Sequence, residues 1–132
     1  MTETSLRAVT KGGQTPKPSF DLCKMKGGGY CPKPLEQAAV FLGKKWTLSI
    51  IVTIGNFGTL RFNDLLRRIG VSQKTLSERL QELERYNLVV RNAFNERPPR
   101  VEYSLTRNGQ KVRKAVLPLL KLAESDALWR NL

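Results

Sequence analysis

The fold is decided by residues 60–105, and above all by residues 62–83, which read FNDLLRRIGVSQKTLSERLQEL. Apolar side chains recur there at helical spacing in two sets: Phe62, Leu65, Leu66 and Ile69, and then Leu76, Leu80 and Leu83. Each set lines one face of a helix. Gly70 suits a left-handed helix end, and the Ser72 hydroxyl can accept from an unpaired N–H at the start of the next helix. The sequence therefore predicts two short amphipathic helices joined by a tight turn.

The segment after these helices has the pattern of a β-hairpin. Residues 88–94 are rich in β-prone side chains, and residues 101–105 alternate apolar and polar as a half-buried strand does. Two adjacent prolines between them cannot donate to a sheet ladder, so they form a stiff loop, which Arg97 and Arg100 flank. This order of elements is that of a winged helix-turn-helix. We expect a mainly α fold with a small β-hairpin, and DNA is the first partner to consider.

Polar side chains gather at the start of the second helix, which is the end that meets base edges in helix-turn-helix proteins. Hydroxyl, amide and ammonium groups there can bond base edges and phosphates. The candidate residues are Ser72, Gln73, Lys74, Thr75 and Ser77. Guanidinium groups on the stiff loop, from Arg97 and Arg100, are expected to reach phosphates or a minor groove. The alternative is an ordinary surface helix followed by a solvated loop, both of which commonly carry polar residues.

The chain resembles HxlR-type transcriptional regulators, a winged helix-turn-helix family within the MarR-like group, from about Cys31 to Trp129. The segments that carry the resemblance are Cys31-Pro32, Gly43 to Leu48, Arg61 to Leu65, Ser72 to Leu80, and Pro98 to Thr106. The resemblance implies a homodimer that binds an operator near a promoter and represses or activates transcription. It also implies DNA contacts from the second helix, up to Arg79, and from Arg97 and Arg100. Arg61, in the third segment, joins this predicted DNA-binding set. A twofold dimer would require an inverted-repeat operator.

Length and charge agree with this expectation. A chain of 132 residues supports one small domain, and a net charge of +12 favours a polyanionic partner. The positive excess is spread along the whole chain, so a winged-helix module that binds RNA or protein stays open as an alternative. Residues 1–30 are rich in Gly, Pro and Lys, which predicts a basic flexible N-terminal arm. Residues 31–132 are then the winged helix-turn-helix domain with its flanking helices.

Composition argues against several other classes of protein. The chain has no histidine, which excludes Ser-His and Cys-His nucleophile pairs and two-Cys two-His zinc sites. We therefore expect neither an enzyme nor a cofactor or metal. The longest uncharged run, Trp46 to Leu60, falls short of the roughly 20 residues that span a bilayer and is expected to be a buried helix. The N-terminus lacks the apolar core of a signal peptide, so a cytoplasmic location without membrane association is expected.

Two flanking segments predict dimerisation helices. Pro34 can open a helix that continues to Leu42. Near the C-terminus, Val112, Val116, Leu119 and Ala123 form one stripe, whereas Leu117, Leu128 and Trp129 fall outside it. One packed face cannot bury both sets, so a second surface must cover the remainder, and the resemblance implies that this surface is the partner subunit. Pro118 should kink or divide this helix. The alternative is a terminal helix that folds onto its own domain.

The two cysteines are the remaining candidates for chemistry. Cys31 occupies a Cys-Pro position that, by the resemblance, implies a thiol sensing oxidants or electrophiles, so an oxidant or small-molecule effector is a candidate partner. Cys23 is additional to the family pattern. Lysines close in sequence favour the thiolate of either cysteine. The separation between Cys23 and Cys31 permits an internal disulfide. A small residue that simply packs at a helix start is the alternative.

Overall fold

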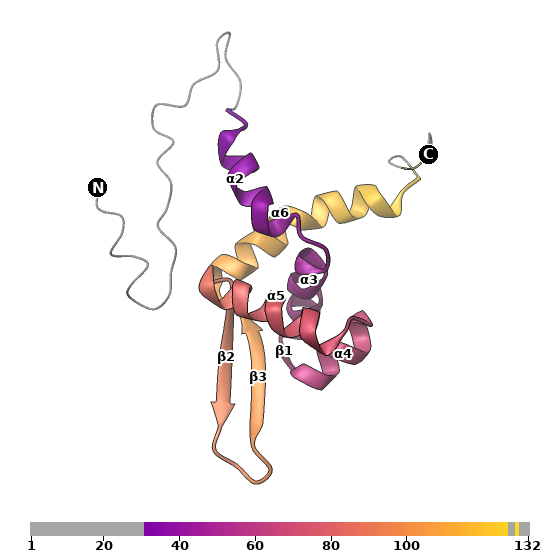
Figure 1. Ribbon diagram of the computed structural model, residues 1–132. Helices are drawn as coiled ribbons and strands as arrows, with labels where there is room; N and C mark the ends of the chain where they lie inside the picture. Colours follow the sequence, from indigo (N-terminus) through magenta and orange to yellow (C-terminus); the bar gives the residue numbers. More distant parts are fainter. Residues whose placement is uncertain (1–30, 127–128, 130–132) are drawn as a thin grey trace, which may run out of the picture.

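The computed structural model describes residues 31–126 and Trp129 (Figure 1). In chain order its elements are α2 (Lys33–Leu42), α3 (Thr47–Phe57), β1 (Thr59–Arg61), α4 (Phe62–Ile69), α5 (Gln73–Arg85), β2 (Val89–Phe94), β3 (Arg100–Leu105) and α6 (Arg107–Glu124). The predicted N-terminal arm lies outside the described residues. Helices α4 and α5, the turn between them and the β2–β3 hairpin confirm the predicted winged helix-turn-helix order.

The core lies between α3, α4, α5 and the sheet. Its fully buried side chains are Ile50, Ile51, Ile54, Leu65, Leu76, Leu80 and Leu83. Phe62, Leu66 and Ile69 are half-buried and pack against this cluster. Both predicted apolar stripes therefore face inward, because a helix buries the side chains that recur at its own period.

The turn between α4 and α5 has the predicted local chemistry. Gly70 ends α4 in the left-handed region, with φ of 75°. The Ser72 Oγ caps α5 by accepting from the Thr75 backbone N–H at 3.2 Å. At the other end of α4, the Arg61 backbone N–H donates to the Asp64 carboxylate at 3.3 Å. The start of each helix is therefore held by a polar side chain.

The sheet has three antiparallel strands in the order β1-β3-β2, one more strand than the predicted hairpin. The additional strand corrects the expectation that the uncharged run from Trp46 to Leu60 is all helix. Helix α3 ends at Phe57, and Gly58 follows with φ of 82°. The chain then turns into β1, where Leu60 pairs with Tyr103 and is buried. Gly58 permits this turn because it lacks a Cβ.

Helix α6 is joined to the base of the hairpin. The Thr106 Oγ1 accepts from the Gly109 N–H at 3.0 Å and donates to the Asn87 carbonyl at 2.6 Å. Gly109 is buried, and a Cβ there would lie 2.1 Å from the Leu88 carbonyl oxygen. Glycine is required at this position because the helix and the α5–β2 connection approach so closely.

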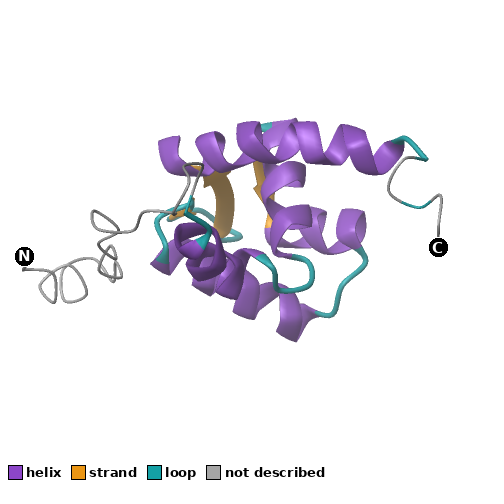
Figure 2. Ribbon diagram, turned by 90° about the horizontal axis from the view of Figure 1, so that it is seen from above, coloured by secondary structure: helices purple, strands orange, loops and turns teal. Residues whose placement is uncertain are grey.

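Helix α2 and the C-terminal half of α6 extend away from the body on the side opposite the hairpin tip (Figures 1 and 2). Leu35 and Val40 on α2 are 73% and 69% exposed, and no residue of that helix is buried. Leu119 was predicted to lie on the packed stripe of α6 but is 52% exposed, because the helix has passed beyond the body by that point. Pro118 lies inside α6 without dividing it, since the missing N–H interrupts only one step of the hydrogen-bond ladder.

Within the part of the chain that the structure describes, no single helix is long and apolar enough to cross a membrane. Helices α2 and α3 meet those criteria only as a pair, bent by 79°.

Candidate nucleic-acid interface

The start of α5 presents its longest polar side chains to solvent. The side chains of Gln73 and Lys74 are exposed, and they make no hydrogen bond or ion pair with other described residues. The hydroxyls of Ser72 and Thr75 lie 3.0 Å apart and belong to the helix cap. Unpaired N–H groups at a helix N-terminus favour anions such as phosphates. This end of α5 therefore combines an anion-favouring backbone with two side chains that can reach base edges.

Ser77 lies about one turn further along α5, on the same face of the helix as Gln73 and Lys74. It lines a groove of about 540 Å³ between α5 and the sheet, together with Phe62, Gln81, Glu84 and Tyr103 among others. The side chain is half-buried. Of the residues predicted at the start of α5, Ser77 is thus the one that faces the sheet rather than open solvent.

The two arginines predicted at the hairpin tip differ from each other. Arg97 lies in the loop, is exposed and makes no ion pair among the described residues. Arg100 is the first residue of β3, and its side chain is 28% exposed. Its guanidinium lies 4.2 Å from the Phe94 ring centroid and within 3.2 Å of both the Glu96 and Glu102 carboxylates. A ring and two carboxylates therefore hold Arg100 against the hairpin, whereas Arg97 is directed to solvent, and a DNA contact from either residue stays a prediction.

Arg61 and Arg79 also occupy different environments. Arg61 is exposed at the start of α4. Arg79 is half-buried on α5, where its Nε donates to the Lys45 carbonyl at 3.1 Å and its Nη1 lies 3.6 Å from a Glu82 carboxylate oxygen. The predicted set therefore contains side chains directed to solvent and side chains already engaged within the domain.

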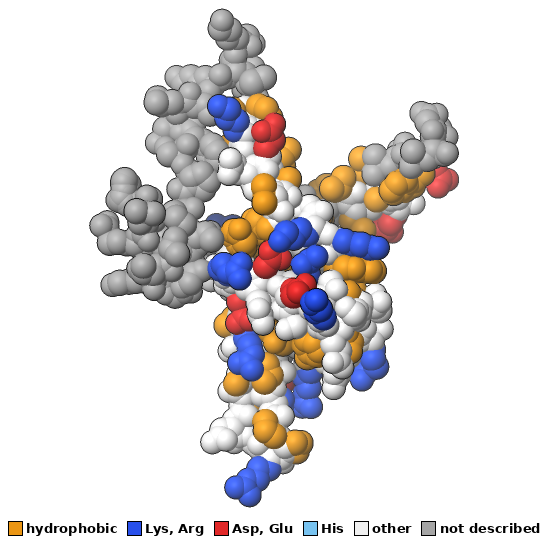
Figure 3. Space-filling model, viewed as in Figure 1, with side chains coloured by type: hydrophobic (Ala, Val, Ile, Leu, Met, Phe, Trp, Pro, Cys, Tyr) orange, Lys and Arg blue, Asp and Glu red, His pale blue; other side chains and the backbone are white. Residues whose placement is uncertain are grey.

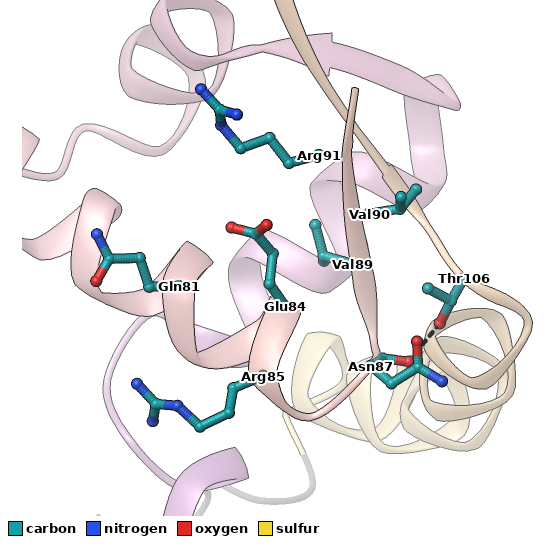
Figure 4. Close-up of a pocket in the computed structure, with 8 residues that line it drawn as sticks. All are labelled: Gln81, Glu84, Arg85, Asn87, Val89, Val90, Arg91 and Thr106. Atoms are coloured by element: carbon teal, nitrogen blue, oxygen red, sulfur yellow. Dashed lines mark hydrogen bonds between the residues drawn. The ribbon is translucent and has the colours of Figure 1, made fainter. Parts of the chain in front are cut away.

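The structure adds Arg91, which sequence reasoning missed. It lies on β2, is exposed, and lines both the groove that contains Ser77 and a neighbouring one of about 520 Å³. Figure 4 shows Arg91 extending from the strand over the opening toward which Gln81 and Glu84 point from α5. Little in the sequence marks this residue, since one arginine in a β-prone segment is equally typical of any solvated strand face.

Lysine and arginine side chains are spread over the visible face of the molecule (Figure 3). They lie on α2, over the helical body with acidic side chains among them, and along the β2–β3 hairpin as far as its tip. In residues 31–126 and 129, no group of three or more Cys, Asp or Glu side chains could hold a metal ion.

Cys31 stands just before α2 and takes part in a disulfide. Cys23, the second predicted redox residue, lies outside the described residues. Cys31 therefore lies at the outer end of α2, away from the body of the domain (Figure 1).

Two helices joined by a capped turn, followed by a hairpin with an exposed arginine in its loop, define a winged helix-turn-helix DNA-binding domain. The family model described as HxlR-like helix-turn-helix matches residues 41–128. The chain belongs to this family, and it is a DNA-binding transcriptional regulator.

Relatives and solved structures agree with this assignment. The HTH-type transcriptional regulator YodB of Bacillus subtilis is 40% identical over 84 residues, which are 63% of this chain and 73% of YodB. Its reduced form superposes with a TM-score of 0.63 at 36% identity, covering 73% of this chain and 93% of that one. Across three further curated relatives the matched part spans 63% to 72% of their length.

Two other structures show the same fold. A MarR-family transcriptional regulator from Enterococcus faecalis V583 has a TM-score of 0.66 at 35% identity, covering 77% of this chain and 93% of that one. The redox regulator HypR in its oxidized form has a TM-score of 0.64 at 33% identity. The superposition covers 69% of this chain and 94% of the HypR chain.

Proposed function

We propose that this regulator acts as a homodimer on an inverted-repeat operator, with α5 in the major groove and the hairpin loop on the adjacent backbone. The observation that carries the proposal is the start of α5, where Gln73 and Lys74 extend from a capped helix end with no partner among the described residues. In a helix-turn-helix, side chains at this position reach base edges. Arg97 supplies an exposed charge for phosphates, whereas Arg100 stabilises the hairpin that carries Arg97.

The dimer part of the proposal rests on apolar surface. Leu119, Leu120 and Leu122 near the end of α6 are exposed, as are Leu35 and Val40 on α2. Several large apolar side chains exposed near one another on a helix favour an interaction site. A second copy related by a twofold axis is the simplest partner because the same patch then covers itself. Since the partner molecule is chromosomal DNA, we infer that the protein works in the cytoplasm, without a membrane.

The test is an enrichment of genomic fragments on the purified protein, followed by footprinting. We expect a protected inverted repeat whose half-sites are centred about 34 to 36 Å apart, one turn of duplex. Competitors of random duplex and of structured RNA at physiological salt serve as controls. Equal retention of RNA, or of any duplex, would contradict the proposal and favour a nonspecific basic protein.

A second candidate function is thiol-based sensing, and the specific observation behind it is the disulfide at Cys31 next to α2. Relatives point the same way, since HypR is described as a redox regulator and YodB was also solved after diamide treatment. In such a step two thiols lose two protons and two electrons, the S–S bond forms, and an azo oxidant such as diamide takes up both protons and both electrons.

This function is tested by measuring operator affinity with reductant and then with diamide, for the native chain and for Cys31→Ser. We expect diamide to change the affinity of the native protein and to leave that of Cys31→Ser unchanged. Identical responses of both proteins would separate Cys31 from DNA binding.

A further inference from the structure

The turn between α2 and α3, residues 43–46, lies against the outer side of α5. The Arg79 Nε donates to the Lys45 carbonyl at 3.1 Å, across 34 residues of sequence. The Lys44 Nζ lies 2.5 Å from one Glu82 carboxylate oxygen, and the Arg79 Nη1 lies 3.6 Å from the other. We call this set of four residues, Lys44, Lys45, Arg79 and Glu82, the bracket. The bracket attaches the turn to Arg79 and Glu82, which lie one helical turn apart in the middle of α5.

The bracket is more sheltered than ordinary surface ion pairs. The side chains of Arg79 and Glu82 are 20% and 19% exposed. Exposed pairs contribute little because water screens them, whereas charge-assisted hydrogen bonds in sheltered positions are stronger and hold one geometry. A phosphate that approached Arg79 would have to compete with a carbonyl and a carboxylate that already bond the guanidinium.

A second contact ties the same segment to the end of α5. The rings of Phe41, on the last turn of α2, and Tyr86, at the C-cap of α5, stack at 3.8 Å with an angle of 2° between their planes. Between these contacts, Trp46 has φ of 80°, a left-handed conformation that fixes the direction of the turn. The segment from the end of α2 to the start of α3 therefore touches α5 at two separate positions.

We propose that Arg79 is a positioning residue, which with Glu82 holds α5 against the α2–α3 turn and so sets the angle of α5 in the DNA groove. It does not contact DNA itself. This inference rests on the proposed role of α5 in the major groove, and it reassigns a residue that the family resemblance places among the DNA contacts. Misplacement of a recognition helix weakens every base contact together, so the effect of Arg79 is on discrimination rather than on the electrostatic term.

The test uses Arg79→Ala, Glu82→Gln and the matched control Glu78→Gln, each in the full chain. Glu82→Gln and Glu78→Gln both remove one negative charge from α5, but only Glu82 belongs to the bracket, because Glu78 is exposed and makes no ion pair among the described residues. The probes are a labelled duplex carrying the most enriched genomic site and a scrambled duplex of equal composition. Affinities are measured over a salt series.

We expect Arg79→Ala and Glu82→Gln to lose roughly tenfold of the discrimination between the two duplexes, at an unchanged salt slope, because both break one coupled charge-assisted network. Glu78→Gln should bind both duplexes as well as the native chain or better, since it only removes a charge that repels phosphate. Tighter binding by Glu82→Gln, like that of the control, would overturn the proposal. So would a fall in salt slope of roughly 1.8 per dimer for Arg79→Ala, which indicates one lost phosphate contact per subunit.

Amide hydrogen exchange provides a readout that does not involve DNA. We expect faster exchange over residues 43–50 in Arg79→Ala and Glu82→Gln and no change in Glu78→Gln, because the turn loses its attachment to α5. Unchanged exchange in both bracket variants would overturn the proposal. If the native chain itself fails to discriminate between the duplexes, the proposed function fails, while the exchange measurement still decides whether the bracket holds the turn.

Discussion

The body of the domain and its two outlying helices use the same apolar side chains in opposite ways. Leu65 on α4 and Leu76, Leu80 and Leu83 on α5 are buried. By contrast, Leu35 on α2 and Leu119 and Leu122 near the end of α6 are exposed. Both regions have helical periodicity in the sequence, so pattern alone does not separate them. The difference teaches that an apolar stripe predicts burial, but whether the burying surface belongs to the same chain depends on where the helix lies relative to the body.

The largest expected effect comes from a substitution in the body. Leu80→Ala, at a side chain that is 1% exposed, should lower the free energy of unfolding by about 2 to 5 kcal/mol, because it leaves a cavity in the core. Leu119→Ala should change stability only in a way that depends on protein concentration, as expected for a subunit contact. Urea unfolding, repeated at several protein concentrations, measures the stability of both variants. A large concentration-independent loss for Leu119→Ala would remove the distinction between the two regions.

The next effect is on assembly. Deleting residues from Ala115 onward, or introducing Leu119→Glu together with Leu122→Glu, should give a monomer or, for the truncation, a poorly soluble chain. Glutamates cost little on the exposed monomer surface but several kcal/mol if a partner buries them unpaired. Sedimentation velocity distinguishes the outcomes. A truncated protein that stays soluble and dimeric and protects the same operator would place the subunit contact elsewhere, while the assignment of α5 would stand.

The polar side chains of α5 differ in the same way: Arg79 is engaged within the domain, whereas Gln73 and Lys74 extend into solvent. Lys74→Ala or Gln73→Ala should reduce discrimination between operator and random duplex by about 1 to 3 kcal/mol, the amount typical of a base-edge contact. Competition titrations measure this loss, and an unchanged circular dichroism spectrum shows that the helix is intact. Equal weakening on both duplexes would instead assign the substituted residue to phosphate.

The smallest effect separates the two arginines of the hairpin. Arg97→Ala should lower the slope of log affinity against log salt by roughly 1.8 in a homodimer, about 0.9 for each lost phosphate contact. Arg100→Ala should lower it less, since Glu96 and Glu102 already neutralise that guanidinium. Titrations over a salt series test both. If Arg97→Ala changes neither slope nor affinity, the hairpin loop is not part of the interface.

The features that were predicted correctly from the sequence depend on interactions between residues that are close together along the chain. The stripes of α4 and α5, the Gly70 helix end, the Ser72 cap and the strands of the hairpin each depend on residues within one or two turns of each other. Strand β1 was missed because three residues are too few to show alternation, and its pairing partner Tyr103 lies far along the chain.

Two arginines of the candidate site have partners that the sequence does not reveal. Arg100 lies beside Glu96 and Glu102 only because the hairpin brings them together. The hydrogen-bond acceptor of Arg79, the Lys45 carbonyl, is 34 residues away along the chain. Sequence shows which side chains carry charge, but the contacts that already use that charge are set by tertiary structure.

In the proposed homodimer, the close approach of Gly109 to Leu88 would give α6 a mechanical role. The first turn of α6 is held by Thr106 to the Asn87 carbonyl, at the point where α5 ends and the hairpin begins. A rotation of α6 about this point must carry the hairpin with it, since no space is left for the two to move separately. The angle between the two α6 helices of such a dimer would therefore determine the distance between its two hairpins.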